Sequence, residues 1–582
     1  MNSNFKLNLP YCLTMGSVLL IGMSQQAIAQ IQPNNNILPD ISQKPDPNSD
    51  RFPQPIPSPS PLPSDTNPSV QPPTVKPDTS DNPNSQTVTV QKINVVGSSI
   101  FTENDFKSIV KPLENSQVTI DKLREVADQV TQLYLNKGYI TTRAVLVDQT
   151  INNGIVEIKV IEGGIQRVEV EGTKKLDPDY IRNRIMLGAG TPLNSARLED
   201  QLRLLRGDPL FKSIEASLKA GDKVGQSILT IRVKEAPQFT TNISVDNYSP
   251  PSIGSERIGA NFNYRNLTGI GDEFFASYYT TTKGGADIFD FSYRVPINPM
   301  NGTVQFRFAP NKNTVVQEPF NVFNIHGESS LLEVSYRQPL TRTPREELAI
   351  SLGFAYQNGQ TFTFAGPTPF GIGPDAQGNT RTRVLKFGQD YVSRDVAGAW
   401  GLRSQFSLGT GWFLATNNKD PDPDGQFFSW LGQIQRVQVL DKDNLLILQI
   451  DAQLSPNSLL PSQQFVVGGG QSVRGYRQNV RAGDNGLRFS VENRMTIFRD
   501  EGGNPTLQFA PFVDVGTVWN QDSNPNKLPR QTFLSGAGIG VIWQPLNNLN
   551  MRFDYGASLV NLDDKGSNAQ DDGLYFSLNY QL

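Results

Sequence analysis

Residues 487–495 read Leu-Arg-Phe-Ser-Val-Glu-Asn-Arg-Met, with apolar and charged side chains in near-strict alternation. Successive side chains of a β-strand point to opposite faces, so this stretch predicts a strand with one apolar and one charged face. Residues 446–454 repeat the pattern, with leucines and an isoleucine facing away from Gln449 and Asp451. Such strands suit a barrel wall that separates lipid from a water-filled interior.

The same alternation continues from Phe239 to the C-terminus, and helical periodicity is absent there. An even number of strands, joined alternately by short and long connections, is typical of bacterial barrels with short periplasmic turns and longer outside loops. This contrast argues against the alternative, a soluble β-sandwich. We therefore predict a transmembrane β-barrel of 16 antiparallel strands over residues 237–582. The strand candidates begin near residues 239, 256, 272, 286, 303, 326, 346, 382, 398, 426, 443, 486, 506, 534, 549 and 573.

The chain ends on a strand-like segment, residues 574–582, with an apolar side chain at every second position. Phe576, Tyr580 and Leu582 share one face of it. We expect this strand to close the barrel against the first one. We also expect the three residues to act as the C-terminal signal read by the barrel-assembly machinery during biogenesis.

Ahead of the barrel lies an internal repeat in which a short strand ended by glycine precedes two helical patterns and a hairpin. The openings are residues 93–97 and 168–172, and the closing hairpins are residues 144–160 and 214–233. The order β-α-α-β-β, twice, is the layout of polypeptide-transport-associated (POTRA) domains. We therefore predict two α+β POTRA domains, residues 87–162 and 163–236, with a generic α+β repeat as the alternative.

The N-terminus has the pattern of a secretory signal over residues 1–29. Lys6 provides the positive charge, residues 11–23 the apolar stretch, and Ala27-Ile28-Ala29 the small-x-small cleavage site. The only cysteine, Cys12, lies in this segment, so we expect no disulfide in the mature chain. Residues 30–86 are rich in proline, serine and asparagine, which predicts a disordered, extended linker.

Enzymatic and metal chemistry find little support. A net charge of -4 gives no general attraction to nucleic acid. The single histidine, His326, has no supporting cluster of catalytic or metal-ligating residues. Residues 420–425, Asp-Pro-Asp-Pro-Asp-Gly, imitate the start of a calcium loop, but two prolines intrude and Leu431 stands where a glutamate is needed. Gly536-x-Gly538-x-Gly540 lies on a strand with no helix after it, which favours small lumen-facing residues over a nucleotide loop. We expect no enzymatic activity, no cofactor, no metal and no nucleic-acid partner.

Two late motifs stand out. Residues 471–476, Gln-Ser-Val-Arg-Gly-Tyr, lie in a long loop, and residues 512–516, Phe-Val-Asp-Val-Gly, lie on an alternating strand. Strand parity turns the two valines toward lipid and therefore turns Asp514 and Gly516 inward. A lipid-facing aspartate would be costly, so an inward direction is expected.

With these motifs, residues 87–582 resemble the outer-membrane transporters of two-partner secretion, the haemolysin secretion/activation family. The resemblance implies a barrel in the outer membrane of a Gram-negative-type bacterium, in contact with its lipid, and POTRA domains in the periplasm. It also implies that loop 455–485 folds back into the pore. The implied lock between loop tip and lumen wall comprises Val473, Arg474, Gly475, Tyr476, Phe512, Asp514 and Gly516, with Arg474 and Asp514 as an ion pair. Family members commonly carry an N-terminal plug helix, but Pro33 and Pro39 break residues 30–44 here.

The function implied is export of a large, unfolded exoprotein partner. We expect an extended segment of the partner to add to the edge of strand 210–218, beside helix 194–206, because edge addition combines backbone hydrogen bonds with side-chain selectivity. The candidate contact residues are Phe211, Ile214, Ala216 and Leu218. Two alternatives remain. One is a barrel-assembly or protein-import relative, which usually carries three or more POTRA domains. The other is a passive solute channel, which needs no periplasmic docking domains.

Overall fold

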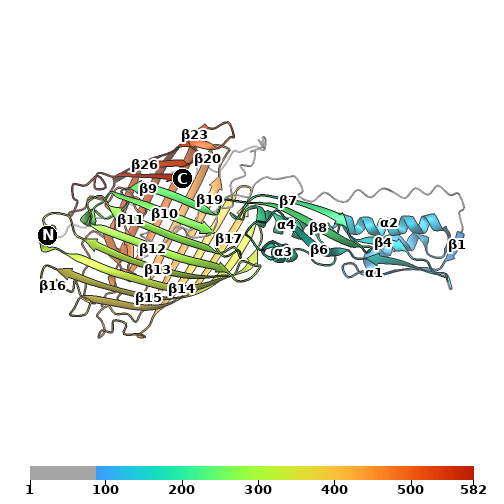
Figure 1. Cartoon of the computed structure of the whole chain (residues 1–582), viewed down its shortest axis with the longest axis horizontal. Coiled ribbons are helices and arrows are strands. Elements are labelled where there is room, and N and C mark those ends of the chain that lie inside the picture. The colour runs from blue at the N-terminus through green and yellow to red at the C-terminus, as the bar shows by residue number, and fades with distance from the viewer. Residues whose placement is uncertain (1–86, 152) are drawn as a thin grey trace, which may run out of the picture.

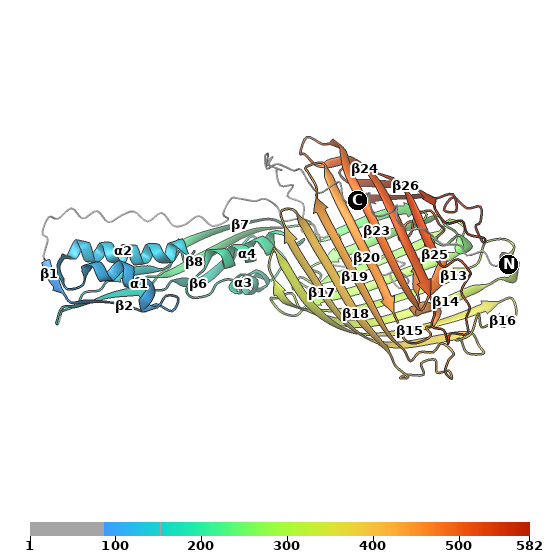
Figure 2. The same ribbon diagram turned by 180° about the vertical axis from the view of Figure 1, so that it is seen from behind.

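A computed structural model of the chain describes residues 87–151 and 153–582. Two small α+β domains and a large barrel follow one another along the long axis (Figures 1 and 2). The predicted signal segment, the proline-rich linker and the question of a plug helix all lie outside the described residues. No helix among the described residues is long and apolar enough to cross a membrane.

The first domain has the predicted strand-helix-helix-strand-strand order, with one addition. Leu123, Val126 and Val130 recur at helical spacing and are fully or almost fully buried in its core. The first helix begins as expected, because the Asp105 carboxylate accepts the backbone N–H of Thr102 at 2.8 Å. The addition is a separate two-stranded sheet of β1 and β3. The elements are β1 (Thr87–Val90), β2 (Lys92–Val96), α1 (Glu103–Val110), η1 (Lys111–Leu113), β3 (Ser116–Thr119), α2 (Ile120–Asn136), β4 (Arg143–Leu146) and β5 (Ile155–Ile161).

The second domain repeats this plan around a sheet of order β6-β8-β7. Strand β6 runs parallel to β8, and β7 pairs with β8 alone, so β7 is an edge strand. Leu198, Leu202 and Leu205 of the second helix are buried against the sheet. The elements are β6 (Gly164–Glu171), α3 (Pro178–Met186), α4 (Ser195–Arg206), β7 (Phe211–Ala220) and β8 (Gln226–Glu235).

Sixteen antiparallel strands form the closed barrel, as predicted, and each begins within three residues of its expected start. The last strand, β27, pairs with the first, β9, from Ser577 opposite Asp246 to Gln581 opposite Asn242. The strands are β9 (Phe239–Asp246), β10 (Arg257–Arg265), β11 (Glu273–Thr281), β12 (Ala286–Pro296), β13 (Thr303–Thr314), β14 (His326–Arg342), β15 (Glu346–Thr363), β17 (Asn379–Asp395), β18 (Gly398–Gly409), β19 (Phe428–Val439), β20 (Asn444–Leu454), β23 (Asn485–Arg499), β24 (Pro505–Trp519), β25 (Phe533–Leu546), β26 (Leu549–Ser558) and β27 (Leu574–Gln581). Short elements lie in the connections: β16 (Gly366–Pro367), η2 (Pro251–Ile253), η3 (Phe320–Phe323) and η4 (Pro461–Gln463).

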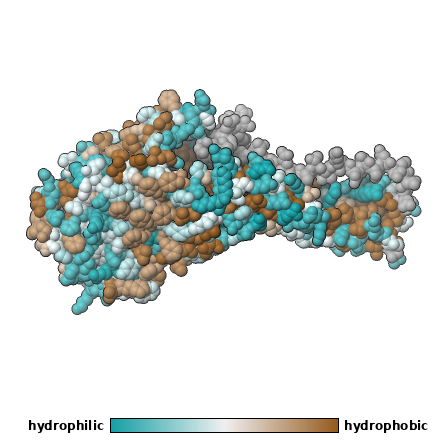
Figure 3. Space-filling view, in the orientation of Figure 1, coloured by the Kyte–Doolittle hydropathy of each residue, from teal (hydrophilic) through white to brown (hydrophobic). Residues whose placement is uncertain are grey.

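The two faces of the wall differ as the alternation predicted. Phe489 and Val513 point outward and are 40% and 45% exposed, whereas Arg488 and Asp514 point inward and are 7% and 0% exposed. Brown and tan side chains accordingly gather over the barrel strands, and teal ones over the narrow region beside the small domains (Figure 3). The wall therefore offers lipid an apolar surface and keeps its charges inside.

A closed barrel makes a direct prediction for gel electrophoresis. Every strand has two hydrogen-bonded neighbours, so no open edge exists from which detergent can unravel the sheet. We expect the unheated protein to migrate faster than the boiled protein. Identical mobility before and after boiling would contradict closure.

Candidate functional site

The connection between β20 and β23, the sixth outer loop, folds back inside the barrel. Two short strands in it, β21 (Phe465–Val467) and β22 (Arg481–Gly483), pair with each other. Val473 and Tyr476 at the loop tip are almost fully buried and pack against Val518 of β24 and Leu534 at the start of β25. The tip, residues 473–476, therefore lies against the inner wall formed by the last strands.

Arg474 is held by Asp514 through three hydrogen bonds. Its Nε donates to Oδ2 at 2.7 Å and its Nη2 to Oδ1 at 3.0 Å, while its backbone N–H donates to Oδ2 at 3.1 Å. The guanidinium carbon also lies 3.3 Å from the centre of the Phe512 ring. Both charged side chains are at least 95% buried. Planar bidentate pairing of this kind fixes direction as well as distance.

Further charged residues surround this pair. Arg474 Nη1 donates to Glu492 Oε2 at 2.8 Å and lies 3.5 Å from Asp554 Oδ1. Arg552 bridges these two carboxylates, with contacts of 2.6 Å to Glu492 and 2.7 Å to Asp554, and Arg494 binds Glu492 at 2.8 Å. Three arginines thus face three carboxylates, counting Asp514. Because no charge is left over, the cluster tolerates burial inside the barrel.

The sequence indicated only part of this cluster. Alternation on 487–495 turned Glu492 and Arg494 inward, and the structure confirms that direction for both. The convergence of Arg552 and Asp554 on the same point depends on the stagger between strands, which a single sequence does not reveal. Alternation along β26 could have indicated that Arg552 and Asp554 point inward, but not that they meet Glu492 and Arg474.

Glycines on the wall make room for the loop tip. A Cβ at Gly536 would collide with the carbonyl oxygen of Arg474, and one at Gly556 would lie 2.8 Å from the nitrogen of Gly475. A Cβ at Gly516 would lie 2.8 Å from a methyl group of Val473. Gly475 itself has a φ of +106°, which side-chain-bearing residues rarely adopt. The expected small, lumen-facing side of Gly536-x-Gly538-x-Gly540 is therefore part of the seat of the loop.

Two tyrosines fix the backbone on either side of the tip. The Tyr575 hydroxyl donates to the Tyr476 carbonyl at 2.6 Å and accepts the N–H of Gly475 at 2.8 Å. The Tyr476 hydroxyl donates to the Ser535 carbonyl at 2.7 Å and accepts the N–H of Val560 at 3.1 Å. The sequence prediction for the last strand concerned only its outward residues, so the inward Tyr575 was missed.

The loop does not fill the lumen. On the side of β12 to β15 a cavity of about 670 Å³ remains, bounded on the loop side by Arg477, Gln478 and Val480. The opposite wall contributes polar uncharged groups such as Asn313, Ser329 and Gln357. A cavity therefore borders the seated loop inside the barrel.

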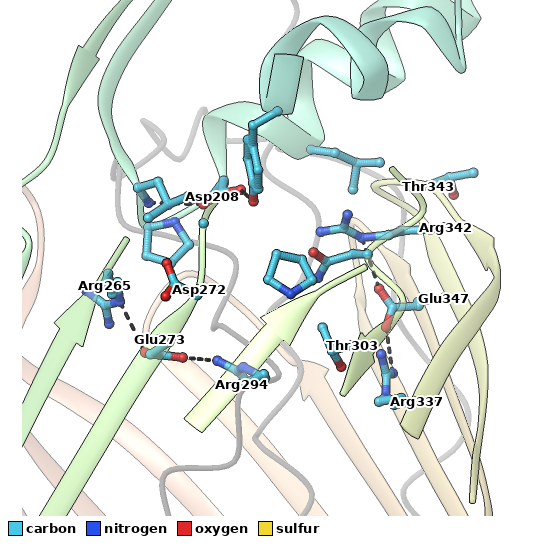
Figure 4. Close-up of a pocket in the computed structure, with 18 of the residues that line it drawn as sticks. Asp208, Arg265, Asp272, Glu273, Arg294, Thr303, Arg337, Arg342, Thr343 and Glu347 are labelled. Carbon is cyan, nitrogen blue, oxygen red and sulfur yellow. Dashed lines mark hydrogen bonds and ion pairs between the residues drawn. The ribbon is translucent and has the colours of Figure 1, made fainter. Parts of the chain in front are cut away.

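At the other end of the barrel, the second POTRA domain docks on the periplasmic turns (Figure 4). The backbone N–H of Asp177 donates to the carbonyl of Gly269 at 2.8 Å, and Arg184 donates to the Asn301 side chain at 3.2 Å. Asp208, just after α4, accepts the Tyr180 hydroxyl at 2.7 Å. Hydrogen bonds from Asp177 and Arg184 thus cross from the domain to the turns of the barrel.

A cavity of about 160 Å³ lies in this junction and is lined by arginines and carboxylates. Figure 4 shows Glu273 between Arg265 and Arg294, and Glu347 reaching Arg337, at 2.6 Å, and Arg342, at 3.5 Å. These pairs connect neighbouring strands at the mouth of the lumen. The periplasmic mouth is thus strongly charged, with ion pairs that join neighbouring strands.

Two glycines allow a test of the junction, because alanine would cause similar backbone strain at both but a side-chain collision at only one of them. Gly271 and Gly284 both have positive φ, +81° and +68°, but a Cβ at Gly271 would collide with the Tyr180 ring, whereas nothing lies within 4 Å at Gly284. We expect Gly271→Ala to loosen the junction and to speed hydrogen exchange at the backbone of Asp177, and Gly284→Ala to leave that exchange unchanged. Equal exchange in the two variants would show that the Tyr180 contact does not hold the domain.

The predicted partner-binding residues require a correction. Phe211 and Ile214 are each only 7% exposed and belong to the domain core, and Ala216 and Leu218 pack partly against it. These side chains face the core because alternate residues of β7 from Ile214 onward point to it, and the irregularity after Phe211 keeps that ring on the same side. They are therefore structural, and the backbone edge of β7 away from β8 pairs with no strand among the described residues. Docking of a partner on that edge stays a prediction.

The single histidine, weighed above as a catalytic or metal-binding candidate, lies at the start of a strand. His326 begins β14, stacks on Phe362 at 4.9 Å and shares its Nδ1 with the Asn324 carbonyl. Over residues 87–151 and 153–582, no group of three or more histidine, cysteine or acidic side chains is placed to hold a metal ion.

Comparison with known proteins agrees with this architecture. A model of the haemolysin secretion/activation protein family matches residues 225–542. A POTRA model of the type found in that family matches residues 88–163, and a second POTRA model, described as a surface antigen variable number repeat, matches residues 164–236.

The individual relatives have low sequence identity to this chain, but the alignments cover most of its length. The chain is 23% identical to the heme/hemopexin transporter protein HuxB of Haemophilus influenzae, over 75% of this chain and 77% of the relative. It is 26% identical to the outer membrane transporter CdiB of Escherichia coli, over 73% and 72%. The solved structure of CdiB from Escherichia coli aligns with 88% of this chain and 93% of that chain, at 21% identity and a TM-score of 0.66. BamA from Haemophilus ducreyi, lacking POTRA domains 1–3, aligns at 14% identity, over 85% of this chain and all of that one, with a TM-score of 0.52.

Proposed function

Because the chain belongs to the haemolysin secretion/activation family of outer-membrane transporters, we propose that it exports a large, unfolded exoprotein from the periplasm to the cell surface. This is the two-partner mode of secretion. The barrel is the pore, and the POTRA domains receive the partner on the periplasmic side.

The observation that carries the proposal is the loop held by Arg474. The tip is fixed partly by the apolar contacts of Val473 and Tyr476 and partly by a charge-balanced cluster on the inner wall. Water can solvate such charges when the tip leaves, so the free-energy difference between seated and unseated loop stays moderate. The loop thus fits the role of a movable gate.

The path we infer begins at the edge of β7. An extended segment of the partner adds to this edge by backbone hydrogen bonds, without needing the buried side chains of the strand. The charged mouth beside Arg294 and Arg337 follows, and then the cavity beside residues 477–480 of the loop. Its amide and hydroxyl side chains can exchange hydrogen bonds with a passing backbone, which keeps friction with the wall low.

The alternative function, barrel assembly, is supported by fold similarity to BamA. The chain has fold similarity to the transporter CdiB as well, so the fold alone does not separate the two functions. One experiment separates them. A candidate exoprotein from the same organism is expressed with and without the chain, and its amounts in medium and periplasm are compared. Export requires that deletion of the chain moves the exoprotein from medium to periplasm while other outer-membrane proteins still insert. Loss of those proteins instead would favour barrel assembly.

A further inference from the structure

Five residues leave the barrel sheet after β18 and then return to it. Thr410 donates its backbone N–H to the Arg383 carbonyl at 2.8 Å, and Thr416 donates to the Arg381 carbonyl at 2.9 Å. The two acceptors are only two positions apart on β17. The intervening residues 411–415, here called the excursion loop, must therefore project out of the plane of the sheet.

The excursion loop lies on the outer surface of the barrel. Phe354 has the parity of Leu352, which is 59% exposed on the outer face of β15, and it contacts the loop. Its ring centre is 6.4 Å from that of Trp412 and 6.1 Å from that of Phe413. The loop therefore covers the outer wall rather than the lumen.

The loop presents three large apolar side chains in succession. Trp412, Phe413 and Leu414 are 51%, 65% and 85% exposed. Phe413 and Leu414 also have φ values of +49° and +59°, a region that bulky residues rarely occupy. Exposure of three large apolar side chains is unfavourable in water, so the loop suits an apolar surrounding.

An outward-facing arginine holds the loop in this conformation. Arg383 is fully buried, stacks on Tyr356 at 3.4 Å and donates through Nε to the Phe413 carbonyl at 3.2 Å. Its other nitrogens donate to the Gln357 carbonyl at 2.8 Å and to Asn358 Oδ1 at 2.9 Å. The guanidinium is thus satisfied by protein oxygens, and the excursion loop shields it from outside.

Register places the loop at the outer margin of the apolar band. Phe354 pairs with Leu385, which pairs with Leu408, and these form the last apolar row on this wall. The next row toward the outside pairs Tyr356 with Arg383. Barrels carry their aromatic girdle at this level, where the hydrocarbon meets the head groups. The loop is therefore continuous with the lipid-facing surface.

We propose that Trp412, Phe413 and Leu414 form a wedge inserted into the outer leaflet of the membrane, at the boundary between acyl chains and head groups. Strands β17 and β18 are the eighth and ninth of the sixteen, diametrically opposite the closure of β27 on β9. The wedge anchors the half of the barrel opposite the last strands, against which the tip of loop 455–485 packs.

Fluorescent labelling tests this directly, because Cys12 is the only native cysteine. On a Cys12→Ser background, Leu414→Cys carries an environment-sensitive NBD label, and the protein is reconstituted in phosphatidylcholine vesicles. Val224→Cys is the control, since this residue is 72% exposed in a turn of the second POTRA domain. We expect a blue-shifted emission at position 414 and quenching by a nitroxide on the acyl chain. At position 224 we expect aqueous emission and quenching by iodide.

Emission at position 414 equal to that at 224, with equal quenching by iodide, would overturn the wedge. Faster gel mobility of the unheated sample verifies that each labelled barrel is folded. Phe413→Cys provides a second labelling site with the same expected result should Leu414→Cys fail that test.

Discussion

Arg474→Ala is expected to reduce export of the exoprotein to the background level while the barrel still folds and inserts. Removing one partner of a buried ion pair costs about 3–5 kcal/mol, which corresponds to roughly a hundredfold or larger shift in the position of the tip. The carboxylates of Asp514, Glu492 and Asp554 would then face only two arginines. A loop without this anchor would no longer return to one defined position, so the gate would lose the ordered movement that export needs. Export is measured as the ratio of exoprotein in medium to exoprotein in cells.

Arg477→Ala is the matched control for this prediction. Arg477 lies three residues further along the same loop and is bound by Asp571 alone, at 2.8 Å, with a fifth of its side chain exposed. We expect a much smaller loss of export from this variant. Undiminished export from Arg474→Ala, in a barrel whose unheated mobility is normal, would remove the assigned role of the Arg474–Asp514 pair.

Gly536→Ala is the second variant for which we expect a large effect, although it adds one methyl group. That group would collide with the Arg474 carbonyl, so the tip must rise from its seat and weaken its hydrogen bonds to Asp514. Overpacking of this kind typically costs about 1–3 kcal/mol. We expect reduced export together with new trypsin cleavage after Arg474 and Arg481, which are at most 4% exposed when the loop is seated.

Gly353→Ala controls for the loss of a strand glycine as such. It also lies on the inner face of the wall, but the nearest atom to a Cβ there is 3.5 Å away, an ordinary contact. Its trypsin pattern and export should match the unmodified protein. A Gly536→Ala protein that resists trypsin equally well would show that the seat accommodates a methyl group and that the glycines there are not needed for docking.

The barrel was predictable because a period of two is a local property of the sequence. Leu487 and Arg488 face opposite sides whatever their neighbours across the sheet are, and so the start of every strand could be estimated to within three residues. The pairing of Arg474 with Asp514 followed from resemblance. Parity alone turned Asp514 inward but could not select its partner.

The residues whose positions were not predicted are placed by contacts between segments that are distant in the sequence. Phe211 and Ile214 were expected at a docking edge, yet alternation on β7 equally allowed them to cover the domain core, and α4 packs on that side. Tyr575 and Asp554 reach the loop tip only because of the stagger of β26 and β27. The excursion loop is defined by two hydrogen bonds to β17. No sequence pattern within residues 410–416 predicts these bonds.

The seat of the gating loop also constrains the order in which the protein can mature. Asp514, Gly536, Gly556 and Tyr575 belong to four successive strands at the very end of the chain, and all four touch the tip. A product truncated before Tyr575 would lack the hydroxyl that binds the Gly475 N–H and the Tyr476 carbonyl, and would therefore hold the loop tip less firmly. Pairing of β27 with β9 closes the wall of the barrel, and Tyr575 on the same strand binds the loop tip. Closure of the wall and binding of the loop therefore depend on one strand.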